Sequence, residues 1–194
     1  MYHGLGYDAR KKGDYMAAIN YYTQALDIFP EHFKVIFNRG FAYDKLGDYE
    51  MAIADYKAAI ALAPQNAFAY YNLGISLDKK GDYDSAVYFF SKAIELDPQK
   101  ADFYHNRGFA WRKKKELGKA IQDYSMAIEK DHYHFKVGQE SVTNHQAFYN
   151  RAFCFDKLGD LSQAERDYRI AVELQPSNST TLYHLATIQE RIGS

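Results

Sequence analysis

The sequence is poor in several features on which common classes of protein depend. It has one cysteine, Cys154, and four prolines among 194 residues. A single cysteine excludes an internal disulfide framework and the cysteine-based zinc sites. No run of about 18 apolar residues is present, so we expect no membrane insertion. The formal net charge is only −1, and we therefore expect no general attraction for nucleic acid.

Aromatic residues are the one clear excess. The chain has 18 tyrosines, 13 phenylalanines and 1 tryptophan, within an ordinary 47% of hydrophobic and 25% of charged residues. So many large rings exclude an intrinsically disordered chain, because they supply enough apolar surface for a packed core. The first residues are polar and basic and do not form a signal-peptide pattern, so we expect an intracellular, cytoplasmic protein.

A repeat of 34 residues organises the chain. Gly-Asp-Tyr begins at Gly13, Gly47 and Gly81, each 34 residues after the last. A degenerate copy, Lys-Glu-Leu, begins at Lys115, and Gly-Asp-Leu begins at Gly159, which is 44 residues later, or one period plus ten. All four prolines keep the same phase, at Pro30, Pro64, Pro98 and Pro176.

Each period predicts two helices, here called the first and second helix of a repeat. In the second repeat, residues 33–46 have helical periodicity, Gly47-Asp48 interrupts it, and 49–62 is helical again before Pro64. Small residues recur where the two helices cross, and large rings recur beside them, which is typical of closely packed antiparallel helices. The small residues of first helices are Gly6, Gly40, Gly74, Gly108 and Ala152. The second-helix rings are Tyr22, Tyr56, Phe90, Tyr124 and Tyr168.

This pattern resembles the tetratricopeptide repeat family over essentially the whole chain. The resemblance implies an all-α, right-handed superhelical solenoid of antiparallel helix pairs, with first helices lining the concave face. We expect a single array over 1–194, with repeats 1–32, 33–66, 67–100, 101–134 and 145–178, an insertion at 135–144 and a terminal helix at 179–192. In this register the chain fits either a piece of a longer array or an array with 179–192 as its capping helix.

Two charged positions change together from repeat to repeat. Three repeats carry an arginine before the small residue of the first helix and an aspartate before the ring of the second. The other two lack both charges and have Leu5 with Tyr21 and Leu73 with Phe89. We therefore predict three partly buried ion pairs, Arg39–Asp55, Arg107–Asp123 and Arg151–Asp167. Such a pair adds little stability compared with an apolar pair, but removing one partner lowers the stability of the fold strongly.

The first helices also carry a row of amides flanked by rings. The amides are Asn38, Asn72, Asn106 and Asn150. The residues before them are Phe37, Tyr71, His105 and Tyr149, and three places after them come Phe41, Ile75, Phe109 and Phe153. An amide row can bind the backbone of an extended peptide, and rings beside it supply contact area. Alternatively, the amides and half of the rings serve stacking between neighbouring helices.

Charged residues near the ends of the first helices have two interpretations. Asp44, Asp78 and Asp156 form an acidic row that favours a basic ligand, unless it is a solvated charged face. The basic turn 112–115, and its weaker copy 10–12, binds phosphate or an acidic partner, unless it is only a solvated loop. If the turn position of Lys115 needs a positive φ, lysine there costs about 1 kcal/mol.

These residues predict a non-catalytic protein-interaction scaffold that binds an extended peptide or a helix of a partner. The two alternatives are a structural module that self-associates and a substrate-recruiting piece of a larger enzyme. We expect no cofactor and no catalytic site, because no phosphate loop or nucleophile motif occurs and Cys154 replaces small packing residues. His132, His134 and His145 lack the companion ligands of a metal site. The cations of the chaperone-type two-carboxylate clamp are also missing, so we do not expect that receptor class.

Overall fold

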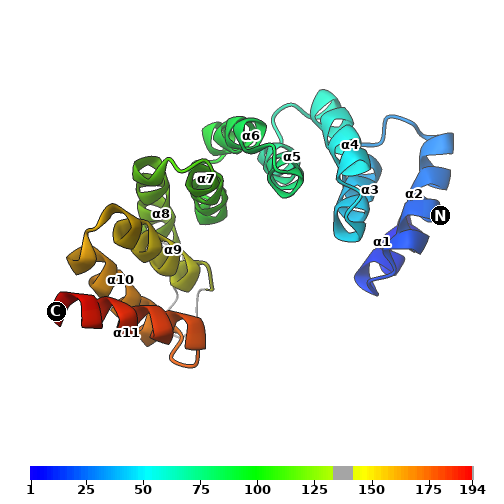
Figure 1. Cartoon of the computed structure of the whole chain (residues 1–194). Helices are drawn as coiled ribbons and strands as arrows, with labels where there is room; N and C mark the ends of the chain where they lie inside the picture. The colour runs from blue at the N-terminus through cyan, green and yellow to red at the C-terminus, as the bar shows by residue number, and fades with distance from the viewer. Residues whose placement is uncertain (133–141, 194) are drawn as a thin grey trace. The chain divides into compact units, whose positions relative to one another are not determined.

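The computed structural model describes residues 1–132 and 142–193, and these residues form eleven α-helices (Figure 1). Within that part of the chain no strand occurs. The predicted all-α class and the pairing of neighbouring helices are confirmed. The helices are α1 Tyr2–Lys11, α2 Tyr15–Ile28, α3 Phe33–Leu46, α4 Tyr49–Leu62, α5 Ala67–Lys80, α6 Tyr83–Leu96, α7 Ala101–Lys113, α8 Leu117–His132, α9 Val142–Leu158, α10 Leu161–Leu174 and α11 Ser179–Gly193.

The chain consists of two compact units. Unit 1, Met1–Asp97, holds α1 to α6, and unit 2, Pro98–Ser194, holds α7 to α11. Inside each unit every helix packs against the helices before and after it in sequence. First helices also touch across the repeats, α1 with α3, α3 with α5, and α7 with α9. The first-helix face of each unit is therefore a continuous surface made by several repeats.

The Gly-Asp pair explains where most helices end and begin. Gly47, Gly81 and Gly159 have φ of +82°, +88° and +84°, the left-handed conformation that closes a helix. The aspartate that follows is the N-cap of the next helix. Its carboxylate accepts a hydrogen bond from the third residue of that helix, and this contact occurs at Asp14, Asp48, Asp82 and Asp160.

Lys115 occupies the glycine position of the fourth repeat. Its φ is +64°, and in residues 1–132 and 142–193 it is the only non-glycine residue with a positive φ. The turn position of Lys115 therefore has the positive φ on which the sequence prediction depended. A side chain in this conformation costs about 1 kcal/mol relative to glycine.

Rings of the second helices lie directly on the small residues of the first. A Cβ atom added to Gly6 would lie 2.6 Å from Tyr22 Cε1, and one added to Gly74 would lie 2.7 Å from Phe90 Cδ1. Tyr22, Tyr56, Phe90, Tyr124 and Tyr168 are all at most 1% exposed. The predicted small-against-large packing is confirmed.

Cys154 is completely buried with Ala120 and Tyr124, and Trp111 packs against this cluster. Burial raises the pKa of the thiol to about 11. The side chain is thus a small packing residue, as the sequence predicts.

The predicted insertion 135–144 lies largely outside the described residues. What the structure adds is that α9 begins at Val142, three residues before the predicted start of the fifth repeat. The terminal helix α11, Ser179–Gly193, follows the predicted range 179–192 closely.

Candidate functional site

The predicted peptide-binding residues all lie on first helices. In unit 1 they are Phe37, Asn38 and Phe41 on α3 and Tyr71 and Asn72 on α5. In unit 2 they are Asn106 and Phe109 on α7 and Tyr149, Asn150 and Phe153 on α9. The candidate site therefore has two parts, one on each unit.

The asparagines have different surroundings. Asn72 Nδ2 donates to the Phe68 carbonyl at 2.7 Å, and Asn106 Nδ2 donates to the Asp102 carbonyl at 2.9 Å, both four residues back in the same helix. Asn150 is buried, and its Nδ2 lies 3.2 Å from His105 Nε2 on α7. Asn150 thus joins two neighbouring first helices, as in the stacking alternative. A single bond leaves the Asn72 amide with further hydrogen-bonding capacity, since an amide has two donor hydrogens and an acceptor oxygen.

The ring before each asparagine packs on the ring of its own second helix. The ring centroids are 5.5 Å apart for Phe37–Tyr56, 5.8 Å for Tyr71–Phe90, 5.6 Å for His105–Tyr124 and 5.7 Å for Tyr149–Tyr168. These four residues are half-buried. They therefore serve packing within the repeat, and two of them also contact the next first helix, His105 through Asn150 on α9 and Tyr149 through His184 on α11.

The second ring position is half-buried as well. Phe41, Phe109 and Phe153 each lie close to an arginine and a lysine. The surface at these rings is thus aromatic and cationic.

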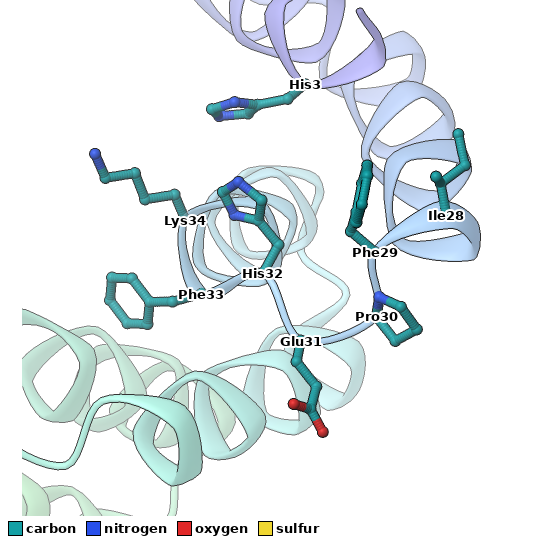
Figure 2. A pocket seen from close by; sticks show the side chains of 8 residues that line it. All are labelled: His3, Ile28, Phe29, Pro30, Glu31, His32, Phe33 and Lys34. Atoms are coloured by element: carbon teal, nitrogen blue, oxygen red, sulfur yellow. The ribbon is translucent and has the colours of Figure 1, made fainter.

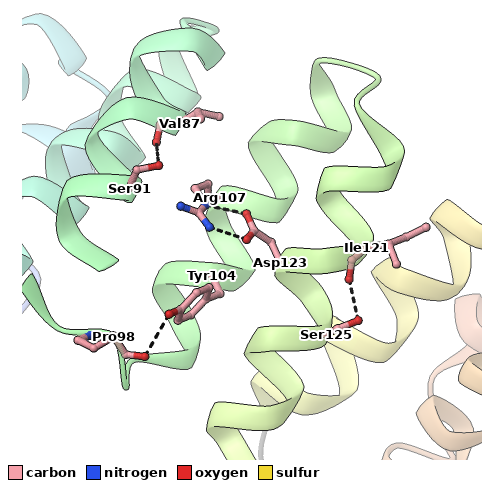
Figure 3. Close-up of polar contacts among 8 residues, drawn as sticks. All are labelled: Val87, Ser91, Pro98, Tyr104, Arg107, Ile121, Asp123 and Ser125. Carbon is pink, nitrogen blue, oxygen red and sulfur yellow. Dashed lines mark hydrogen bonds and ion pairs between the residues drawn. The ribbon is translucent and has the colours of Figure 1, made fainter. Parts of the chain in front are cut away.

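The structure forms each of the three arginine–aspartate pairs. Figure 3 shows Arg107, whose Nε and Nη2 donate to the two Asp123 oxygens at 2.8 and 2.7 Å. The aspartate side chains are 5–7% exposed and the arginine side chains 19–22%. The hydrogen bonds to Asp55 raise the pKa of Arg39. These pairs hold the two helices of a repeat together.

Arg39 and Arg151 also bind the preceding repeat. Arg39 Nη1 donates to Thr23 Oγ1 on α2 at 3.2 Å, and Arg151 Nη1 donates to Ser125 Oγ on α8 at 2.9 Å. One guanidinium therefore connects three helices in each case.

The acidic row does not face a ligand at two of its three positions. Asp44 is buried, accepts a hydrogen bond from Ser76 Oγ at 2.9 Å, and pairs with Lys79 Nζ at 2.5 Å. Asp156 pairs with Arg191 of α11. The hypothesis of a basic ligand was wrong for these two residues, because each carboxylate already pairs with a cation of the next first helix.

A hollow of about 870 Å³ at the α2–α3 connection was not predicted (Figure 2). The His3 and His32 rings lie 5.3 Å apart beside it, and Ile28 and Phe29 are 57% and 67% exposed. Burial, followed by the charges of His32 and Lys34, lowers the pKa of His3. The sequence feature that could have indicated this hollow is Phe29, an aromatic residue at a position where later repeats have Ala63 and Asp97.

Family models for the tetratricopeptide repeat match residues 3–67, 37–101, 71–133 and 145–178. The chain belongs to the tetratricopeptide repeat family. Similar solved structures include MamA, with 24% identity, a TM-score of 0.79, and 91% of this chain and 97% of the other covered. MamA from Desulfovibrio magneticus RS-1 has 21% identity, a TM-score of 0.81, and 92% and 95% coverage. YrrB, described as a tetratricopeptide repeat protein with an unusual peptide-binding site, has 19% identity, a TM-score of 0.75, and 94% and 89% coverage.

At these identities the solved structures support the fold alone. Among curated proteins, none matches the sequence significantly. Across the described ranges, each helix is too short or too polar to traverse a bilayer.

Proposed function

We propose that this tetratricopeptide repeat protein is a non-catalytic interaction scaffold that binds an extended peptide or a helix of a partner protein on its first-helix faces. The observation that carries the proposal is a half-buried ring at the same first-helix place in both units, Phe41 in unit 1 and Phe109 and Phe153 in unit 2. Partly exposed rings on a rigid helical surface are typical of binding hot spots, because they give large contact area at low entropic cost.

Two further features support this assignment. The Asn72 and Asn106 amides lie beside the rings and have side chains suited to backbone groups of a peptide. The similar protein YrrB is described as having a peptide-binding site, although a likeness at 19% identity supports only the fold.

The test is selection of binding peptides on the whole chain, followed by affinity measurement with Phe41→Ala/Phe109→Ala. We expect this double variant to bind at least about tenfold more weakly, since a hot-spot residue contributes more than 1 kcal/mol. Lys57→Ala/Gln122→Ala, on exposed positions of α4 and α8, is the matched control. Full binding by the aromatic variant, with its helical circular dichroism unchanged, contradicts the proposal.

Self-association is the second candidate. The exposed Ile28 and Phe29 beside the hollow of Figure 2 favour it, because exposed apolar side chains gain by burial against another molecule. Light scattering over a hundredfold range of concentration tests it. A mass equal to one chain throughout contradicts self-association and leaves the peptide-binding proposal standing.

A further inference from the structure

Two clusters of cations and rings have the same construction, one in each unit. The Arg10 cluster consists of Tyr7, Arg10, Lys11, Phe41 and Lys45, on α1 and α3. The Arg112 cluster consists of Phe109, Arg112, Lys113, Phe153 and Lys157, on α7 and α9. In each cluster one first helix supplies a ring, the arginine and a lysine, and the next first helix supplies a ring and a lysine. The corresponding residues have the same positions in the repeat, so the arrangement occurs twice in the chain.

The arginine of each cluster lies between two rings. Arg10 Cζ is 5.2 Å from the centroids of both Tyr7, on its own helix, and Phe41, on the next first helix. Arg112 Cζ is 4.8 Å from the Phe109 centroid and 5.1 Å from that of Phe153. The rings of two successive repeats therefore fix the position of one guanidinium.

A lysine lies four residues after each ring and contacts its face. In the Arg10 cluster, Lys11 Nζ is 5.1 Å from the Tyr7 centroid and Lys45 Nζ is 5.2 Å from that of Phe41. In the Arg112 cluster, Lys113 Nζ is 5.2 Å from Phe109 and Lys157 Nζ is 5.3 Å from Phe153. Each cluster thus gathers three positive charges around two rings.

The charge of the clusters is not neutralised within residues 1–132 and 142–193. There, no carboxylate lies within ion-pair distance of the six cations. The buried Nε atoms of Arg10 and Arg112 make no geometrically complete hydrogen bond, and the groups that interact with these guanidinium ions are the uncharged hydroxyls of Tyr22 and Tyr124. The adjacent carboxylates Asp44 and Asp156 are held by Lys79 and Arg191. Aromatic rings attract cations through their quadrupole but leave the charge uncompensated.

Comparison among the repeats shows that the arginine is a local departure. The equivalent positions of the second and fifth repeats are Asp44 and Asp156, which serve helix stacking. Only the first and fourth repeats have arginine there, and only these two have a ring at both neighbouring places. Stacking of repeats therefore does not require the guanidinium.

We propose that each cluster binds an anionic side-chain group, carboxylate or phosphate, of an acidic peptide segment in a partner protein. This inference rests on the proposed function and names the chemistry of its ligand. Guanidinium N–H groups bind carboxylate and phosphate oxygens strongly, and the two lysines add point charges. Phe41, Phe109 and Phe153 belong both to the clusters and to the proposed peptide site, so apolar groups next to the acid contact the same rings.

The test begins with a random dodecapeptide library displayed on phage and selected on the whole chain. Enrichment of Asp and Glu among the selected peptides is the expected result. Peptides that bind without such enrichment and weaken with Phe41→Ala/Phe109→Ala overturn this inference while the proposed function stands. If no peptide is enriched over a blank surface, both fail.

The selected peptides are then measured against Arg10→Gln/Arg112→Gln. We expect a loss of about tenfold or more in affinity, and a smaller loss in 0.5 M salt, because the missing contacts are hydrogen bonds between charged groups. Lys57→Gln/Arg166→Gln removes the same charge from exposed second-helix positions, one in each unit, and should bind as the parent does. Equal losses in both variants overturn the inference, because only the overall charge would then matter.

Replacing the selected glutamates distinguishes the two anions. Glutamine peptides should lose binding to the parent chain, and tighter binding of phosphoserine peptides than of glutamate peptides would assign phosphate as the preferred group. Undiminished binding of the glutamine peptides contradicts the proposal.

Two controls accompany the protein variants. Thermal unfolding of Arg10→Gln/Arg112→Gln checks its fold. Arg10→Lys/Arg112→Lys should recover part of the affinity, since lysine keeps the charge but lacks the planar fork.

Discussion

At the scale of single residues, the arginine–aspartate pairs occur in three repeats and are replaced by uncharged residues in the other two. The third repeat has Leu73 and Phe89 at the two positions. The same backbone therefore accepts either a bidentate ion pair or an apolar pair. This fits the general finding that a buried pair contributes little beyond an apolar one, although its two members depend on each other.

Asp123→Ala should lower the free energy of unfolding by about 3 kcal/mol, because Arg107 loses both of its carboxylate contacts in a largely buried place. Chemical denaturation followed by Trp111 fluorescence measures this. Arg107→Leu/Asp123→Phe reproduces the third repeat and should recover most of the loss. An unchanged midpoint in Asp123→Ala would contradict the structural role of the pair.

His105 makes the stability dependent on pH. Burial lowers its pKa below the ordinary 6.5, Asp102 opposes this shift and Arg112 adds to it. The unfolded chain therefore binds a proton at a higher pH than the folded chain does. Stability should be complete above pH 6.5 and fall as the pH drops from 6.5 toward the folded-state pKa.

A titration of His105 by NMR should give a midpoint below 6.5 in the folded protein, and the free energy of unfolding should fall between pH 7 and pH 5.5. His105→Gln should reduce that fall, because glutamine does not titrate. A folded-state midpoint at or above 6.5 would refute the sign of the effect.

At the scale of helices, one glycine–aspartate pair performs two tasks, ending a first helix and capping a second. The helix bounds follow from it so directly that the predicted ranges 33–46 and 49–62 match α3 and α4. Only the fourth repeat departs, with Lys115 at a φ of +64°. Local chain chemistry thus accounts for where most of the helices begin and end.

Lys115→Gly should raise the free energy of unfolding by about 1 kcal/mol, because glycine adopts this φ without strain. The reverse change, Gly159→Lys, places a side chain at a φ of +84° and should lower it by a similar amount. Thermal unfolding of both variants beside the parent measures the pair. Equal stability of all three proteins would show that the turn carries no strain.

At the scale of the whole molecule, packing inside each unit joins helices that are neighbours in sequence, together with first helices of adjacent repeats. Stability in such arrays is close to a sum of repeat terms and nearest-neighbour terms. A local defect should therefore stay local, in contrast to a globular domain with one core.

Asp55→Ala should increase amide hydrogen exchange in α2, α3 and α4, since it frees Arg39 from a network that includes Thr23. Exchange in α9 and α10 should stay as in the parent protein. Asp167→Ala should give the opposite distribution, through Arg151 and Ser125. Equal acceleration in both units would contradict nearest-neighbour stability.

The fold was predictable because the repeat contains its own comparison, and that comparison also revealed the three ion pairs. For the candidate site, the sequence predicted only which residue types recur along the first helices. Asn150 contacts His105 across two helices, and Asp44 pairs with Lys79 of the next first helix. Repetition shows that such residues recur, but not which partner each one reaches, since that depends on how successive repeats are rotated against each other.

The cluster of Trp111 and Cys154 gives this chain a built-in spectroscopic asymmetry. Its only tryptophan and its only cysteine are in unit 2 and pack in the same cluster. Indole emission excited near 295 nm therefore reports on α7, α8 and α9 of unit 2, because unit 1 has no tryptophan. Unfolding of unit 2 can thus be followed by its own tryptophan, and comparison with the helical circular dichroism of the whole chain shows whether unit 1 unfolds with it.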